Sequence, residues 1–259
     1  MWIAGLIIIA VGVGAFFYMR STKSELHAMI GTETLSIPEL ESLRAISDEL
    51  GSKGGFRKTA EVVGASHPRP DGLLTAELSK TECVWYRFEV HRKYEATEIQ
   101  DGKRRTVQRS ERVAGGTSWE GYALVDEQQR TIGVDPNGTP PDGAEQSINR
   151  FEPHNGGRDG LQLFGFKIPG LSAGNSTIGY EYEEWVLRPG RRLYILGEVH
   201  DKIGPLVISK PENDGHFIIS TRTESDLRTS REKLHKFLSI GVIAAAIIGT
   251  GLVVGGLVS

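Results

Sequence analysis

The chain has 259 residues, with 30 basic and 33 acidic side chains and a net charge of −3. This length fits one or two ordinary domains. The small net charge provides no global field that would attract nucleic acid, so no nucleic-acid partner is expected. Apolar residues gather at the two ends, and every Lys and Arg lies between positions 20 and 236.

Both ends of the chain have the length and composition of membrane spans. Trp2 to Met19 contains 18 residues without a charge, and Phe237 to Val258 contains 22. As helices they would measure roughly 27 and 33 Å, close to the thickness of a bilayer core. We therefore predict transmembrane helices at 1–19 and 237–258. A cleaved signal peptide is the alternative for the first segment, but no basic side chain precedes its apolar run.

The charges beside the two spans predict their orientation. The basic residues next to them all lie on the inner side: Arg20, Lys23, Arg228, Arg231, Lys233 and Lys236. The positive-inside rule then places residues 20–236 in the cytoplasm and both termini outside. Cys83 is the only cysteine, so no disulfide framework is expected. The lipid bilayer is the first predicted partner.

Glycines are dense in both spans and include the pair Gly251 and Gly255, spaced as Gly-x-x-x-Gly. Small residues at this spacing allow close helix packing in membranes. We expect the two spans to pair within one chain; a homo-oligomer formed through the spans is the alternative.

Between the spans, the pattern predicts a short helical segment followed by strands. Residues 20–51 form a juxtamembrane segment with an amphipathic helix at 37–50, which begins with a capping box of Ser36 and Glu39. Alternating apolar residues predict a β-rich domain at 52–222. A helix at 223–236 then leads into the second span. The predicted fold class is a membrane protein with two transmembrane helices flanking a mostly-β (α+β) cytoplasmic domain.

The most patterned inner stretch is residues 180–199, YEYEEWVLRPGRRLYILGEV. Pro189 and Gly190 form the residue pair of a type II turn, so we predict a hairpin in which Trp185 faces Tyr194. The second strand is apolar on both faces, which predicts a central, buried strand.

No complete catalytic set is visible in the sequence. Glu184 lies in an otherwise apolar row, where a carboxylate could be a catalytic acid with a raised pKa. More often, such an acid pairs with a nearby Arg or sits at the rim of a sheet. Cys83 begins a strand and is a second weak candidate, as a nucleophile. The seven histidines are scattered, so no metal site and no cofactor are expected.

Four segments occur in order between the spans: residues 82–90, 122–136, 180–199 and 216–227. Together they resemble the GIDE family, also called the BAM or "beside a membrane" domain, best known from a RING-type ubiquitin ligase of the mitochondrial outer membrane. The signature residues are Trp85, Tyr86, Trp185, Pro189, Gly190, Tyr194 and Gly197. The resemblance covers most of residues 50–230.

One part of the family pattern is missing. In the eukaryotic ligases the zinc-binding RING residues follow the second span, whereas this sequence ends at Ser259. Ligase activity is therefore not carried over, and the chain resembles a prokaryotic member in a bacterial plasma membrane.

Two functional hypotheses follow. The first is a binding or scaffold domain that recognises a membrane-proximal protein, through the Gly-rich loop 135–179 and nearby strands. The alternative is an enzyme: a ubiquitin-ligase-family protein working with a separate catalytic partner, in protein ubiquitination or an organelle or stress response, or a hydrolase using Glu184 or Cys83.

Overall fold

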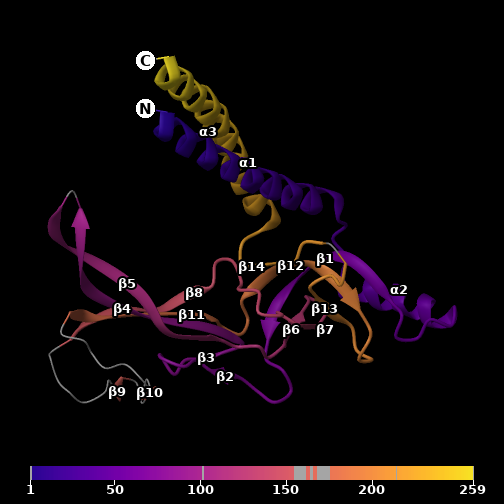
Figure 1. Cartoon of the computed structure of the whole chain (residues 1–259). Helices are drawn as coiled ribbons and strands as arrows, with labels where there is room; N and C mark the ends of the chain where they lie inside the picture. Colours follow the sequence, from indigo (N-terminus) through magenta and orange to yellow (C-terminus); the bar gives the residue numbers. More distant parts are fainter. Residues whose placement is uncertain are drawn as a thin grey trace.

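The computed structural model describes residues 2–100, 102–154, 162–163, 166–167, 176–213 and 215–258. Two long helices, α1 (Trp2–Gly31) and α3 (Glu224–Val258), rise together from one side of a β-rich body, with both termini at their far end (Figure 1). Both helices are long and apolar enough to cross a membrane. The predicted architecture of two membrane helices flanking a mostly-β (α+β) domain is confirmed.

Both helices extend beyond the predicted spans. Helix α1 continues past Met19 to Gly31, and α3 runs unbroken from Glu224 into its apolar part. The Oγ1 atom of Thr223 accepts the N–H of Asp226 at 3.2 Å, which caps the start of α3. Each of the two helices therefore runs without a break from the β-rich body into its apolar segment.

Helices α1 and α3 pack against each other within the chain, as expected, and the tightest spacing lies at glycines other than the predicted pair. A Cβ atom on Gly249 would lie 2.6 Å from Cγ1 of Ile9 and 3.1 Å from the carbonyl oxygen of Gly5. Cβ atoms on Gly251 or Gly255 would meet nothing within 4 Å. Gly249 thus lies at the close approach, together with Gly5 and Gly256, whereas a side chain at Gly251 would have open space.

This packing predicts different costs for the same substitution at two nearby glycines. Gly249→Val should force the helices apart and destabilise the chain by about 1–3 kcal/mol, the usual cost of overpacking. Gly251→Val should have little effect. Thermal unfolding of both variants in detergent, followed by circular dichroism, measures the difference. Equal losses would contradict this helix interface.

The body is built around a closed barrel of five strands. Its members are β1 (Arg57–His67), β6 (Tyr122–Val125), β7 (Thr131–Val134), β12 (Arg192–His200) and β13 (Val207–Ser209). They follow the ring order β1-β6-β7-β13-β12, and β12 closes on β1. The β7–β13 contact is parallel. In chain order the ring is 1-2-3-5-4, the topology of an OB-fold barrel.

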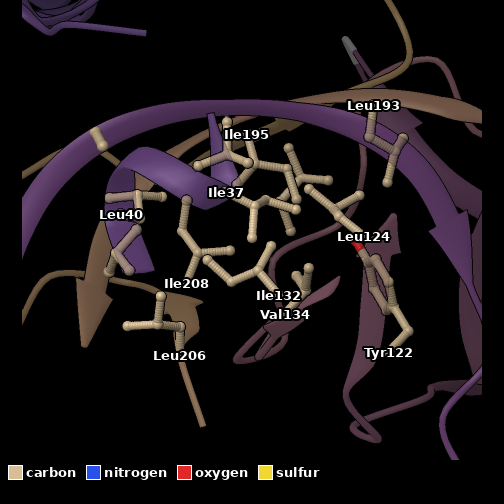
Figure 2. Close-up of a cluster of buried hydrophobic side chains, with 14 of the residues drawn as sticks. Ile37, Leu40, Tyr122, Leu124, Ile132, Val134, Leu193, Ile195, Leu206 and Ile208 are labelled. Atoms are coloured by element: carbon tan, nitrogen blue, oxygen red, sulfur yellow. The ribbon is translucent and has the colours of Figure 1, made fainter. Parts of the chain in front are cut away.

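Helix α2 (Ile37–Glu49) packs its first turn against the core of this barrel. It carries the predicted capping box, with Ser36 and Glu39 bonded in both directions. Ile37 and Leu40 are fully buried and point among the side chains of the barrel strands (Figure 2). Leu193 and Ile195 of β12 and Leu124 of β6 belong to the same core.

A second sheet extends from the barrel and is formed by two insertions. Its strand order is β5-β4-β11-β8. The strands are β4 (Trp85–Gln100), β5 (Lys103–Thr117), β8 (Glu145–Pro153) and β11 (Thr177–Leu187). The remaining strands are short and lie outside this sheet: β2 (Leu74–Thr75), β3 (Glu82–Cys83), β9 (Gln162–Leu163), β10 (Phe166–Lys167) and β14 (Ile218–Ser220).

The predicted hairpin at 180–199 is wrong. Strand β11 pairs with β4 and β8, so Trp185 lies opposite Arg87 and Gln146. Strand β12 pairs with β1, β13 and β14, so Tyr194 lies opposite Val63 and Ser220. The two strands belong to different sheets. The prediction of a central, buried second strand is confirmed.

The Pro189–Gly190 turn exists, but it is a corner that leads from the second sheet into the barrel. Gly190 has a φ of +78° and donates its N–H to the carbonyl oxygen of Ser66 at 2.7 Å. The Ser66 hydroxyl donates to the carbonyl of Arg188 at 2.8 Å and accepts the N–H of Arg191 at 3.1 Å. Bonds to β1 thus replace the bonds that a hairpin would have formed.

Candidate functional site

Glu184 is fully buried, and its carboxylate accepts hydrogen bonds from two backbone N–H groups and one hydroxyl. Its Oε1 atom accepts the N–H of Leu78 at 2.6 Å, and its Oε2 atom accepts the N–H of Ser79 at 3.0 Å. The hydroxyl of Ser147 also donates to Oε2, at 2.9 Å. The carboxylate therefore fastens the turn between β2 and β3 onto the second sheet. This geometry leaves it poorly placed to serve as a catalytic acid.

Cys83 is also fully buried, packed with Ala76 and Val186. Burial, followed by the negative charge of Glu184, raises the pKa of its thiol to about 11. Since the thiolate is the nucleophilic form, Cys83 is inert at neutral pH.

Alkylation can test this environment. In the native chain, Cys83 should resist iodoacetamide at pH 8, and the same reagent should label it within minutes after unfolding. The raised pKa also means that the folded state binds the thiol proton more tightly than the unfolded state does. The contribution of the Cys83 thiol to the free energy of unfolding is full below the pKa of the unfolded state and falls as pH rises toward 11. Rapid labelling of the folded chain at pH 8 would contradict the buried, protonated thiol.

The signature residues divide between the second sheet and the barrel. Trp85 and Tyr86 begin β4 and Trp185 lies near the end of β11, whereas Tyr194 and Gly197 lie in the barrel strand β12. A Cβ atom on Gly197 would lie 2.7 Å from the carbonyl oxygen of Ser209. Gly197 therefore allows the close approach of β12 and β13.

His200 is the last residue of β12, and Asp201 begins the turn that follows it. The Asp201 carboxylate accepts the N–H groups of Phe56 at 3.0 Å and Gly54 at 3.2 Å. Burial lowers the pKa of His200. Asp201 thus secures the start of β1.

The membrane helices are seated on the outer face of the barrel. Met29 of α1 and Leu227 of α3 are buried against Tyr194 and Leu196 of β12. The Arg228 guanidinium donates to the carbonyl oxygen of Met29 at 2.8 Å, which ties α3 to α1. We call this contact the junction.

A buried carboxyl group lies within the junction. Glu61 of β1 is 1% exposed. It accepts hydrogen bonds from the hydroxyls of Tyr194 and, at 2.8 Å, Thr34. Burial raises its pKa, while the two hydroxyls oppose this rise, and Glu224 and Arg228 act on it from α3 with opposite signs. Sequence inspection missed Glu61, because one acid among small and apolar residues carries no motif.

A raised pKa makes the junction more stable when Glu61 is protonated. The contribution is full below the ordinary carboxyl pKa and is lost as pH rises through the raised value. We expect Glu61→Gln to remove this loss, because the amide stays neutral and both hydroxyls can still bond to it. Relative to the variant, the native chain should lose on the order of 1 kcal/mol between pH 4 and pH 8.

Thermal unfolding in detergent across that pH range measures the effect. Glu49→Gln, at an exposed end of α2, is the matched control and should leave the pH profile unchanged. A Glu61→Gln profile parallel to that of the native chain would contradict a titrating Glu61.

A groove runs along β1 beside the junction. It consists of cavities of about 520 and 270 Å³ that share Thr34, Val63 and Arg192 as lining residues. One end is closed by the turn between β6 and β7, including Gln128, and the other by the start of α3. Among the described residues, no carboxylate lies within ion-pairing distance of the Arg192 guanidinium.

The backbone of β1 is open at this groove. The backbone N–H of Glu61 donates to the carbonyl oxygen of Glu33, and the carbonyl oxygen of Glu61 accepts the N–H of Leu35. Both backbone groups of Glu61 therefore point away from β12. Because bonding directions alternate along a strand, Val63 faces the same way. Pairing with β6 begins only at Ala65. The N–H and C=O of Val63 therefore point into the groove.

One cluster on the second sheet has the composition of a metal site. Ligand atoms of Glu89, His91 and Glu183 lie within 4.8 Å of one another. However, Glu89 already pairs with His91 at 3.0 Å and with the guanidinium groups of Arg87 and Arg112. Resident cations thus neutralise Glu89, and we interpret the cluster as an ion-pair network around that residue. The sequence hides it because its members come from two strands.

The Gly-rich loop 135–179 was the predicted recognition element. Most of its second half, residues 155–161, 164–165 and 168–175, lies outside the described residues.

These features define a membrane-anchored β-barrel domain with a lateral groove and no assembled catalytic group at the predicted positions. A family model named GIDE and described as "E3 Ubiquitin ligase" matches residues 91–255, and the chain belongs to this family. The match includes the corner at Pro189 and Gly190, strand β12 and most of α3. Comparisons with curated proteins and with solved structures found no match.

Proposed function

We propose that this chain is a membrane-anchored binding or scaffold domain that holds a partner protein beside the bilayer. The observation that carries the proposal is the groove: it combines an open strand edge at Val63 with the cation of Arg192, which pairs with no carboxylate of the described residues, directly beside the junction. We further propose that residues 20–236 lie in the cytoplasm of a bacterium, with the chain in the plasma membrane. The flanking basic residues support this orientation.

The chemistry of the groove favours an extended peptide segment with an acidic side chain or a free carboxylate. An extended peptide can bond to an exposed strand edge through its backbone, while pockets beside that edge select its side chains. Arg192 supplies a fork of N–H donors that suits a carboxylate. Cavities of this size are typical of ligand sites.

The surroundings of the catalytic candidates support binding over chemistry. Glu184 bonds to backbone N–H groups and a hydroxyl, and the thiol of Cys83 is protonated at neutral pH. The barrel topology is compatible with a binding role, although a fold alone does not determine function.

The family match favours a second candidate. As a GIDE member, the chain could act in ubiquitin transfer or a related modification, by holding a substrate for a separate catalytic protein. The groove would then bind either the substrate or the catalytic partner.

Photo-crosslinking in native membranes tests the proposal. The full chain carries benzoylphenylalanine in place of Gln128, at the groove, or in place of Ile203, an exposed site on a distant turn. We expect an adduct from the first position only, with a crosslinked partner peptide that contains an acid. Arg192→Glu should reduce the yield about fivefold, the equivalent of roughly 1 kcal/mol of binding.

Arg191→Glu is the matched control, because Arg191 lines a different cavity. It should leave the adduct unchanged. Equal yields from both crosslinker positions, or equal effects of both substitutions, would overturn the groove as the binding site. An adduct with a ubiquitin-type ligase or conjugating protein would favour the second candidate.

A further inference from the structure

Strands β4 and β5 form a hairpin that reaches well beyond the second sheet. Tyr94 is the last β4 residue paired with β11, whereas the pairing with β5 continues to Gln100 and Lys103. Residues 95–100 and 103–108 therefore form a ribbon of only two strands. Such a ribbon is marginally stable in water on its own, so its end is suited to contact with another surface.

The end of the ribbon is basic and carries one large apolar side chain. Lys103, Arg104 and Arg105 are exposed, and Ile99, opposite Arg104, is 74% exposed. Glu98 is already paired with Arg109. Among the described residues, no carboxylate lies within ion-pairing distance of the three tip cations.

The ribbon points toward the membrane. In Figure 1 the end of the β4–β5 hairpin rises on the same side of the body as α1 and α3. If both helices cross the bilayer, everything between them lies on one side of it. The tip is then directed at the bilayer surface, whichever way the chain is oriented.

We infer that the tip of the β4–β5 hairpin binds the anionic lipid headgroups of the bilayer that α1 and α3 cross. Lys103, Arg104 and Arg105 would contact the phosphates, and Ile99 would enter the interface. Anionic leaflets attract basic segments held close to their surface. The position of the ribbon favours lipid over nucleic acid, and the tip offers no aromatic platform on which bases could stack. This contact would hold the body at a third point, separate from the groove.

An environment-sensitive dye on the tip tests this contact. Gln100→Cys is labelled with a nitrobenzoxadiazole dye; the only native cysteine, Cys83, is buried and stays unlabelled. The full chain is placed in nanodiscs of phosphatidylcholine, with or without about one third phosphatidylglycerol. We expect blue-shifted emission, and quenching by spin-labelled lipid, only in the anionic discs.

Charge reversal identifies the cations responsible. Arg104→Glu should lower the partition of the tip into the surface by about fivefold, and reversing all three cations should abolish the shift. Lys53→Glu, on the exposed turn before β1, is the matched control and should change nothing. Ile99→Ser should weaken the shift while leaving the charge of the tip unchanged, which guards against a reversed variant that fails to fold.

Three outcomes would overturn the inference. One is an equal shift in neutral and anionic discs, and a second is no shift in either. The third is a shift that appears only when an oligonucleotide or a soluble protein is added. Adding inorganic phosphate to neutral discs should leave the emission unchanged; a shift there would show binding of free anions in place of the bilayer.

Discussion

The structure depends on one strand, β12, which faces the barrel core on one side and the membrane helices on the other. Leu193 and Ile195 point inward, while Tyr194 and Leu196 support Met29 and Leu227. Successive side chains of a strand lie on opposite faces. Residues that pack in the barrel core therefore alternate along β12 with residues that contact the membrane helices. Because α1 and α3 are continuous through the junction, a tilt of the helix pair would be transmitted directly to the barrel. A flexible linker would have absorbed it.

The junction and the groove both include Thr34. Thr34 bonds to the buried carboxyl group of Glu61 and also lines both cavities. A ligand that displaced Thr34 would disturb the bonding of Glu61, and protonation of Glu61 would in turn affect the groove. Linkage of this kind is reciprocal. Binding in the groove, if it displaces Thr34, would thus act on the seating of the helices through a few atoms.

Local patterns predicted the helices well and the strand partners poorly. The apolar lengths of the spans and the capping box at Ser36 are short-range features, and the structure reproduces them. At Pro189 and Gly190 the turn chemistry was also right. What failed was the inference that the flanking strands pair with each other. Both are apolar enough to sit in a sheet, but their partners, β4 and β8 for one and β1 and β13 for the other, are set by distant segments. The same limit explains the misplaced glycine contact, since spacing along one helix does not reveal which face meets its neighbour.

The candidate site shows why an unusual residue can be found from the sequence while its role stays hidden. Glu184 was noticed because it interrupts an apolar row, and it is indeed buried. Its main partners are the N–H groups of Leu78 and Ser79, which every sequence carries at every residue except proline. A buried turn with free N–H groups needs a strong acceptor, and a carboxylate meets that need with two oxygens. The acid is thus explained by the backbone it holds, whereas the groove is assembled from five separated segments, none of which is unusual in its residue types.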